Sequence, residues 1–173
     1  MEFTSQEEID SLVSAPKTIV EPYRYRLKPE HGYWRDGFDL KSPDHDGSFR
    51  VFMRINASFE ENFSIGLVYM FPSKGSIPLL RCNGPHGGYE RQGKNYFASP
   101  SHDAHTNQYH IHPANLQNIL EGRRAEQGGI PTTDYMTFEE ALDFFLKKIN
   151  VVGHLRFFPP AQVELPLSTG GES

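Results

Sequence analysis

The chain has 173 residues, of which 37% are hydrophobic and 23% are charged. This length and composition are typical of one globular domain that needs no disulfides. The formal net charge of −5 argues against broad, non-specific binding to nucleic acid, but it is compatible with a small local basic site. The single cysteine, Cys82, excludes an intramolecular disulfide and a cysteine-based zinc site.

The N-terminal residues are acidic and polar, which is not the pattern of a signal peptide. No apolar run approaches the roughly 20 residues that cross a bilayer. We therefore expect a cytoplasmic protein.

A short helix is the first predicted element. Residues 5–8, Ser-Gln-Glu-Glu, fit a capping box, and Ile9, Leu12 and Val13 form one apolar stripe that Pro16 ends. From there to about residue 32 the sequence predicts an extended segment or an edge strand.

Four strands are predicted next, over residues 34–41, 48–56, 62–71 and 77–83. The second and third have the clearest alternation of apolar and polar residues in the chain. The connections between them are short, which favours an antiparallel meander.

The segment 84–108 is rich in Gly, His, Ser, Asn and Pro and has no periodicity, so we predict a long functional loop. Residues 109–112 are strand-like, and Pro113 suits the first turn of a helix. A third helix begins at the capping box of residues 137–140, and a further strand is predicted over 151–158. The predicted fold is a single α+β domain over residues 1–166, an antiparallel β-meander sheet packed by N-terminal and C-terminal helices, followed by a disordered tail over 167–173.

Histidines gather in and after the long loop. They are His86, His102, His105, His110 and His112. If residues 109–112 are extended, His110 and His112 project from the same face of the strand, and Ile111 projects from the other. Two rings on one face are suited to proton transfer or to binding one ligand.

Two kinds of chemistry remain open for this cluster. In the first, His110 and His112, with His86, act as acid and base without a metal while Arg81 stabilises the developing negative charge. Candidate substrate-binding residues for this chemistry are Asn83, Tyr89, Arg91 and Lys94. In the second, His110 and His112 bind a transition metal. The carboxylate that often accompanies such a pair is missing, and only Asp103 or Glu121 is available to replace it.

The segment Leu80-Arg81-Cys82-Asn83-Gly84-Pro85-His86, followed by His110-Ile111-His112 and a C-terminal helix, resembles the TumE-type toxins of bacterial toxin–antitoxin systems and related small bacterial proteins. The resemblance covers about residues 78–152 and extends to Arg81, Asn83, His86, His110 and His112. Cys82-Asn83 stands where an aromatic–aspartate pair is expected. The resemblance implies a toxin-like protein that acts on RNA and is regulated by an antitoxin protein.

From these features we predict a toxin-like protein, a metal-independent ribonuclease that uses the His-x-His pair and needs no cofactor. Two alternatives come from other classes. One is a non-catalytic module that binds a protein partner or a small ligand, and the other is a histidine-based metal-binding protein.

Overall fold

The structure is a computed structural model of the chain. It describes residues 3–73, 75–86, 89–92, 95–98 and 107–159, with the backbone alone for 89–92 and 95–98. The predicted tail over 167–173 lies outside these residues.

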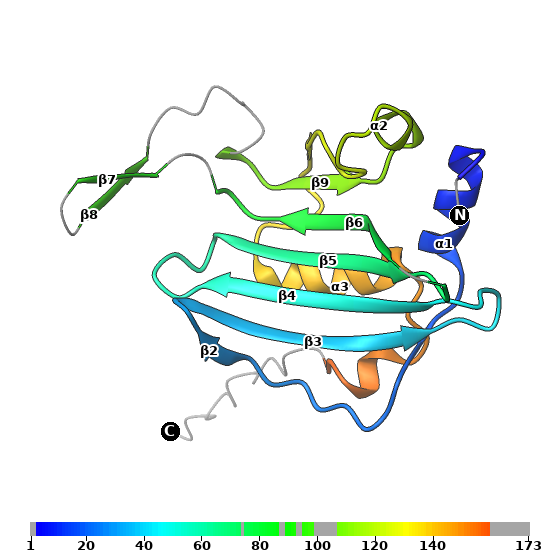
Figure 1. Cartoon of the computed structure of the whole chain (residues 1–173). Coiled ribbons are helices and arrows are strands. Elements are labelled where there is room, and N and C mark those ends of the chain that lie inside the picture. The colour runs from blue at the N-terminus through cyan, green and yellow to red at the C-terminus, as the bar shows by residue number, and fades with distance from the viewer. Residues whose placement is uncertain (1–2, 74, 87–88, 93–94, 99–106, 160–173) are drawn as a thin grey trace, which may run out of the picture.

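One antiparallel sheet forms the body of the protein (Figure 1). Its strands are β1 (Thr18–Ile19), β2 (Lys28–Glu30), β3 (Tyr33–Lys41), β4 (Ser48–Asn56), β5 (Phe63–Met70), β6 (Ser76–Asn83), β9 (His110–Pro113) and β10 (Ile130–Pro131). They lie in the order β1-β3-β4-β5-β6-β9-β10, and β2 also pairs with β3. Neighbours β3 to β6 follow one another in sequence, so the predicted antiparallel meander and the α+β class are confirmed.

The sheet has one apolar face, and helix α3 (Phe138–Lys148) packs against it (Figure 1). On β4, Phe49, Val51, Met53 and Ile55 alternate with more exposed residues and are all buried. The helix begins where predicted, because the Thr137 side chain accepts a hydrogen bond from the backbone N–H of Glu140. Alternation on the strands and the apolar stripe on α3 together form the core.

Helix α1 (Gln6–Ser14) lies at the end of the sheet beside β6 (Figure 1). As predicted, Ser5 caps it by accepting from the Glu8 N–H. The residues that follow α1 lead into a fully buried lysine, Lys17. Its Nζ donates to the carbonyls of Val13 (2.8 Å), Ala15 (2.8 Å) and Ile149 (3.1 Å), so one ammonium group satisfies carbonyls at the C-terminal ends of α1 and α3. Burial lowers the pKa of Lys17 to about 8.

The other face of the sheet is turned toward the viewer in Figure 1, away from α3. Its residues include several basic ones, the small Gly37, Ser64 and Gly66, and the aromatic Phe52. The register brings Arg35 opposite Arg54 and Arg54 opposite Ser64. This surface, made by the residues of β2 to β9 that point away from α3, is called the open face below.

Three predicted elements differ in the structure. Inside the predicted loop, β7 (Tyr89–Gln92) and β8 (Asn95–Ala98) form a two-stranded hairpin, which Figure 1 shows projecting from the body. Pro113 ends β9 and does not begin a helix. The next helix, α2 (Leu116–Leu120), is capped by Asn115, whose side chain accepts from two backbone N–H groups.

The strand predicted over 151–158 is also wrong. Val151 forms only an isolated bridge with Lys17. Gly153 then adopts a left-handed conformation (φ 72°) and leads into a 3-10 helix, His154–Arg156. A left-handed residue turns the chain out of an extended path, so no strand continues.

Among the described residues, no helix has both the length and the apolar character required to cross a bilayer.

Candidate functional site

Strands β6 and β9 hold the predicted site together. Their register pairs Arg81 with His112 and Asn83 with His110, so all four side chains lie on the open face. Ile111 pairs with Cys82 on the opposite face, as the alternation predicted. Asn83 and His110 are the last pair of β6 and β9, and His86 follows three residues beyond Asn83.

Three of the predicted histidines meet at this point. The side chains of His86, His110 and His112 each offer one ring nitrogen, and these atoms all lie within 4.8 Å of one another. The Nε2 atoms of His86 and His110 are 3.1 Å apart. His110 is fully buried, His112 is nearly so, and His86 is half-buried.

Backbone carbonyls fix the orientation of two rings. The Nδ1 of His110 is 2.6 Å from the carbonyl oxygen of Gln108, and the Nδ1 of His112 is 3.1 Å from that of Glu126. A carbonyl oxygen can only accept, so each Nδ1 carries the hydrogen and donates it. In the neutral ring, Nε2 is then the atom with the lone pair. Both rings are therefore oriented as metal-ligating histidines commonly are, with one nitrogen held by an outer hydrogen bond.

Asn83 connects this cluster to the rest of the sheet. Its Oδ1 accepts a hydrogen bond from the Ser64 hydroxyl (2.7 Å), which directs Nδ2 toward the histidines. Nδ2 lies 3.2 Å from Nε2 of His110 and 3.4 Å from Nε2 of His86. The amide is thus a donor aimed at ring nitrogens that can accept.

Tyr135 supports the backbone behind the cluster. Its hydroxyl donates to the carbonyl of His110 (2.7 Å) and lies 3.3 Å from that of Asn83. The residue is buried, and burial strongly raises the pKa of its phenol. The neutral phenol therefore holds β6 and β9 together where the two strands part.

Arg81 lies beside the cluster with a buried carboxylate for a partner. Its guanidinium is 3.5 Å from Oε1 of Glu126, which also contacts Arg124 at 2.7 Å. Burial lowers the pKa of Arg81, Glu126 raises it, and Arg124 and Arg54 lower it. Arginine is so basic that Arg81 keeps its charge at neutral pH. The two arginines and one carboxylate leave a net positive charge at this end of the site.

A pocket of about 570 Å³ is lined by residues that adjoin the histidines in the chain, but by none of the three histidines themselves. Its lining includes Pro85, next to His86, and Gln108, whose carbonyl holds His110. A second pocket of similar volume is lined by Trp34, Phe63 and Met136 among others and contains none of the histidines. His86, which is half-buried, is the most accessible member of the cluster.

The other predicted site residues are placed differently. Tyr89 and Arg91 lie on the β7–β8 hairpin, for which the backbone alone is described, and Lys94 lies outside the described residues. His102, His105 and Asp103 also lie outside them. Glu121, considered as a replacement carboxylate, instead pairs with Arg123.

Sequence reasoning missed Ser64, Glu126 and Tyr135. Ser64 has a recognisable signal, since it occupies a polar position on a strand with clear alternation. Glu126 and Tyr135 stand in irregular segments where no periodicity indicates their orientation.

Comparisons with protein-family models, with curated proteins and with solved structures found no match to this chain.

Proposed function

We propose that the protein is a metal-dependent hydrolase in which His86, His110 and His112 bind a transition-metal ion such as Zn²⁺. The observation that carries the proposal is the convergence of three ring nitrogens within 4.8 Å. The Nδ1 hydrogen bonds of His110 and His112 to backbone carbonyls support it, because metal-ligating histidines commonly donate their other ring N–H to such an acceptor.

The distances suit one ion. Zinc binds imidazole nitrogen at about 2.0–2.1 Å, so two ligands of a tetrahedral site lie about 3.4 Å apart. The Nε2 atoms of His86 and His110 are 3.1 Å apart. Even a pair of ring nitrogens 4.8 Å apart, the limit for this cluster, needs to approach by only about 1.4 Å for both to bind the same ion.

The same distances are unfavourable for two histidines acting as acid and base across a phosphate. In phosphoryl transfer the attacking and leaving oxygens are roughly in line on opposite sides of phosphorus. An acid and a base that each contact one of these oxygens at about 2.8 Å are then about 6 Å or more apart. His86 and His110 are too close together for that arrangement, which is why we favour the metal over the metal-independent reaction expected from the sequence.

Three histidine ligands leave open coordination positions, as in catalytic zinc sites. A bound ion of this kind lowers the pKa of water to about 7 and so supplies hydroxide at neutral pH. Arg81 and Arg124 add positive charge next to the cluster, which suits an anionic ester as substrate.

The test begins with metal binding to the full chain. Purified protein is stripped with chelator and titrated with Zn²⁺, Mn²⁺ and Ni²⁺ by calorimetry, and one ion is expected to bind per chain. His112→Asn is the matched variant, because its amide nitrogen can still donate to the Glu126 carbonyl while the Nε2 ligand is lost. His31→Asn is the control, since His31 is exposed and its φ of 47° is well tolerated by asparagine.

We expect His31→Asn to bind as the wild type does and His112→Asn to lose at least a hundredfold in affinity. Turnover of bis(p-nitrophenyl) phosphate, a generic phosphodiester, should require the ion and be lost in His112→Asn. Equal metal binding by wild type and His112→Asn would refute the site. Turnover that survives chelation would refute the metal-dependent reaction and favour the metal-independent one.

A toxic activity and a protein antitoxin, which the resemblance to TumE-type toxins implies, stay predictions. Growth arrest on expression, relieved in His112→Asn, is the measurement that bears on them.

A further inference from the structure

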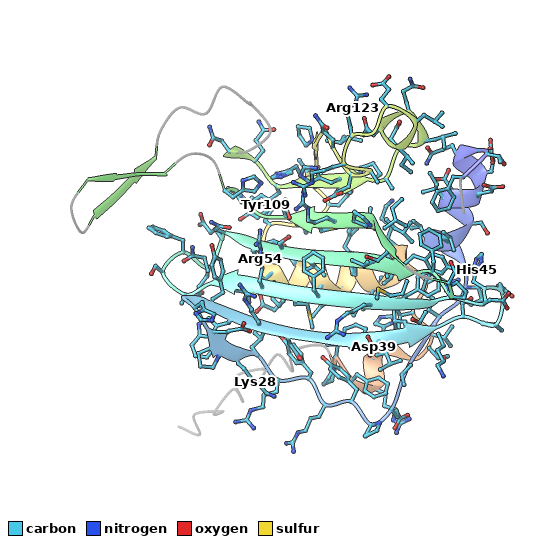
Figure 2. The ribbon with its side chains drawn as sticks, viewed as in Figure 1. Lys28, Asp39, His45, Arg54, Tyr109 and Arg123 are labelled. Carbon is cyan, nitrogen blue, oxygen red and sulfur yellow. The ribbon has the colours of Figure 1, made fainter. Side chains whose placement is uncertain are left out.

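The open face carries an unusual share of the positive charge of an acidic protein. Its basic residues are Lys28, Arg35, Lys41, Arg50, Arg54 and Arg81. On the same strands and the same face, the described acidic residues are Glu30 and Asp39. The chain as a whole has a net charge of −5. Figure 2 shows Arg54 and Asp39 on this face, turned toward the viewer.

The basic residues are ordered by the register of the sheet. One row of directly paired positions crosses it in the sequence Lys28, Arg35, Arg54, Ser64, Asn83, His110. Neighbouring strands lie about 4.8 Å apart, so Arg54 stands about 14 Å from the histidine at the end of the row. The exposed part of this row, which ends at Arg54, therefore lies on the same face as the candidate metal site, and the buried Ser64 and Asn83 stand between them.

The adjacent row presents an aromatic ring. It runs from Gly37 through Phe52, Gly66 and Arg81 to His112. The Phe52 ring lies over Gly66, because a Cβ on that glycine would collide with the ring. Phe52 is half-buried, so part of the ring stays accessible on a polar surface. A flat ring beside arginines is the combination with which β-sheet faces bind nucleobases and phosphates.

Among the described arginines of the open face, Arg54 is the one most available for a ligand. It lies 5.7 Å from the ring centroid of Tyr33 and is exposed. Arg35 and Arg50 have carboxylate partners at 3.7 Å, whereas Arg54 makes no ion pair with any residue in the described ranges. Its charge is therefore available to a phosphate group.

We infer that the open face binds a single-stranded nucleic acid, with its phosphates on Arg35 and Arg54 and a base stacked on Phe52. This inference rests on the proposed function, because it names the substrate class of that hydrolase. The reaction would add water across one phosphodiester. The hydroxide oxygen forms a bond to phosphorus, the P–O bond to the leaving oxygen breaks, and that oxygen takes up a proton.

The experiment measures binding without cleavage. A fluorescein-labelled 12-nucleotide oligouridylate is titrated with metal-stripped protein, and anisotropy is followed between 50 and 200 mM salt. Arg54→Gln should weaken binding about tenfold and reduce the slope of log K against log salt by about 0.7, the value for one phosphate contact on a single strand. Arg156→Gln, on the 3-10 helix after α3, removes an equal charge away from the open face and should change neither quantity.

Phe52→Leu separates stacking from charge. It should weaken binding about fivefold to tenfold while leaving the salt slope unchanged, because stacking releases no counterions. An Arg54→Gln variant with the affinity and slope of the wild type would overturn the inference, and so would a duplex of the same length that binds as tightly as the single strand. Oligothymidylate binding with the same dependence on Arg54 supports it.

The oligonucleotide-binding measurement needs no metal, so the metal site and the nucleic-acid site can be refuted independently. Loss of zinc binding with intact Arg54-dependent nucleic-acid binding refutes the metal site alone. Zinc-dependent turnover of bis(p-nitrophenyl) phosphate without nucleic-acid binding refutes the inference alone.

Discussion

Replacing the buried Lys17 by methionine sets two physical effects against each other. Methionine retains an apolar stem of similar length but loses the ammonium group that donates to Val13, Ala15 and Ile149. Three charge-assisted hydrogen bonds at about 1.5 kcal/mol each amount to about 4–5 kcal/mol. The opposing effect is desolvation, which lowers the pKa of Lys17 from 10.5 to about 8 and corresponds to about 3 kcal/mol. We expect Lys17→Met to be less stable at pH 7 by about 1–2 kcal/mol.

The pH dependence follows from the lowered pKa of Lys17. Below pH 8 the lysine is protonated in both the folded and unfolded states, so it adds no slope to the stability. Between pH 8 and 10.5 the unfolded chain binds more protons, and the stability of the wild type rises with pH relative to the variant. The difference between wild type and Lys17→Met should grow by about 1 kcal/mol from pH 7 to pH 9.

Urea unfolding measures the stability difference between wild type and Lys17→Met at pH 7 and at pH 9. It is followed by circular dichroism and by the fluorescence of the single tryptophan. Lys148→Met is the control, because Lys148 is an exposed lysine near the same end of α3. A Lys17→Met variant as stable as the wild type at pH 7 would show that desolvation outweighs the hydrogen bonds. A difference that shrinks toward pH 9 would contradict the direction of the pKa shift.

Two further predictions concern the support of the site. Cys82 is fully buried, and burial raises the pKa of its thiol to about 12. A thiol reagent such as Ellman's reagent should therefore leave Cys82 unmodified at pH 8 until the protein is unfolded in urea. Labelling of the native protein within minutes would contradict this. Tyr135→Phe removes the donor to the buried carbonyl of His110 and should lower the free energy of unfolding by about 1–2 kcal/mol. The control is Tyr25→Phe, at an exposed position, which should change the free energy of unfolding by less than about 0.5 kcal/mol in the same urea titration. Equal effects of the two substitutions would be evidence that Tyr135 does not support the site.

The parts of the fold that were predictable are those in which local pattern and tertiary environment agree. Strand β4 has the predicted bounds because it lies between two neighbours, with one face against α3 and the other exposed. Helices α1 and α3 begin at the predicted caps because capping is a local interaction. Residues 151–158 are apolar enough for a strand, but Lys17 offers backbone pairing to Val151 alone and Gly153 then turns the chain.

The candidate site likewise has a part that the sequence predicted and a part that it did not. The same-face orientation of His110 and His112 followed from the period of a strand. The meeting of these rings with His86 depends on the pairing of β6 with β9. Asn83 and His110 are 27 residues apart in the chain, and no local pattern contains that register. The roles of Glu126 and Tyr135 depend on irregular segments that fold back over the sheet.

The pairing of Asn83 with His110 also has a consequence for how the chain tolerates change. Strand β6 ends at Asn83 and β9 begins at His110, directly opposite it, so the ladder and the Tyr135 hydroxyl fix the two ends between which the intervening segment runs. Doubling the length of such a segment costs only about 0.6 kcal/mol in closure entropy. We therefore expect that segments of different length and sequence can be grafted between residues 87 and 108. His110 and His112, with Arg54 and Arg81 on the neighbouring strands, should keep their positions. In this sense the paired strands form a fixed frame that can carry different inserts.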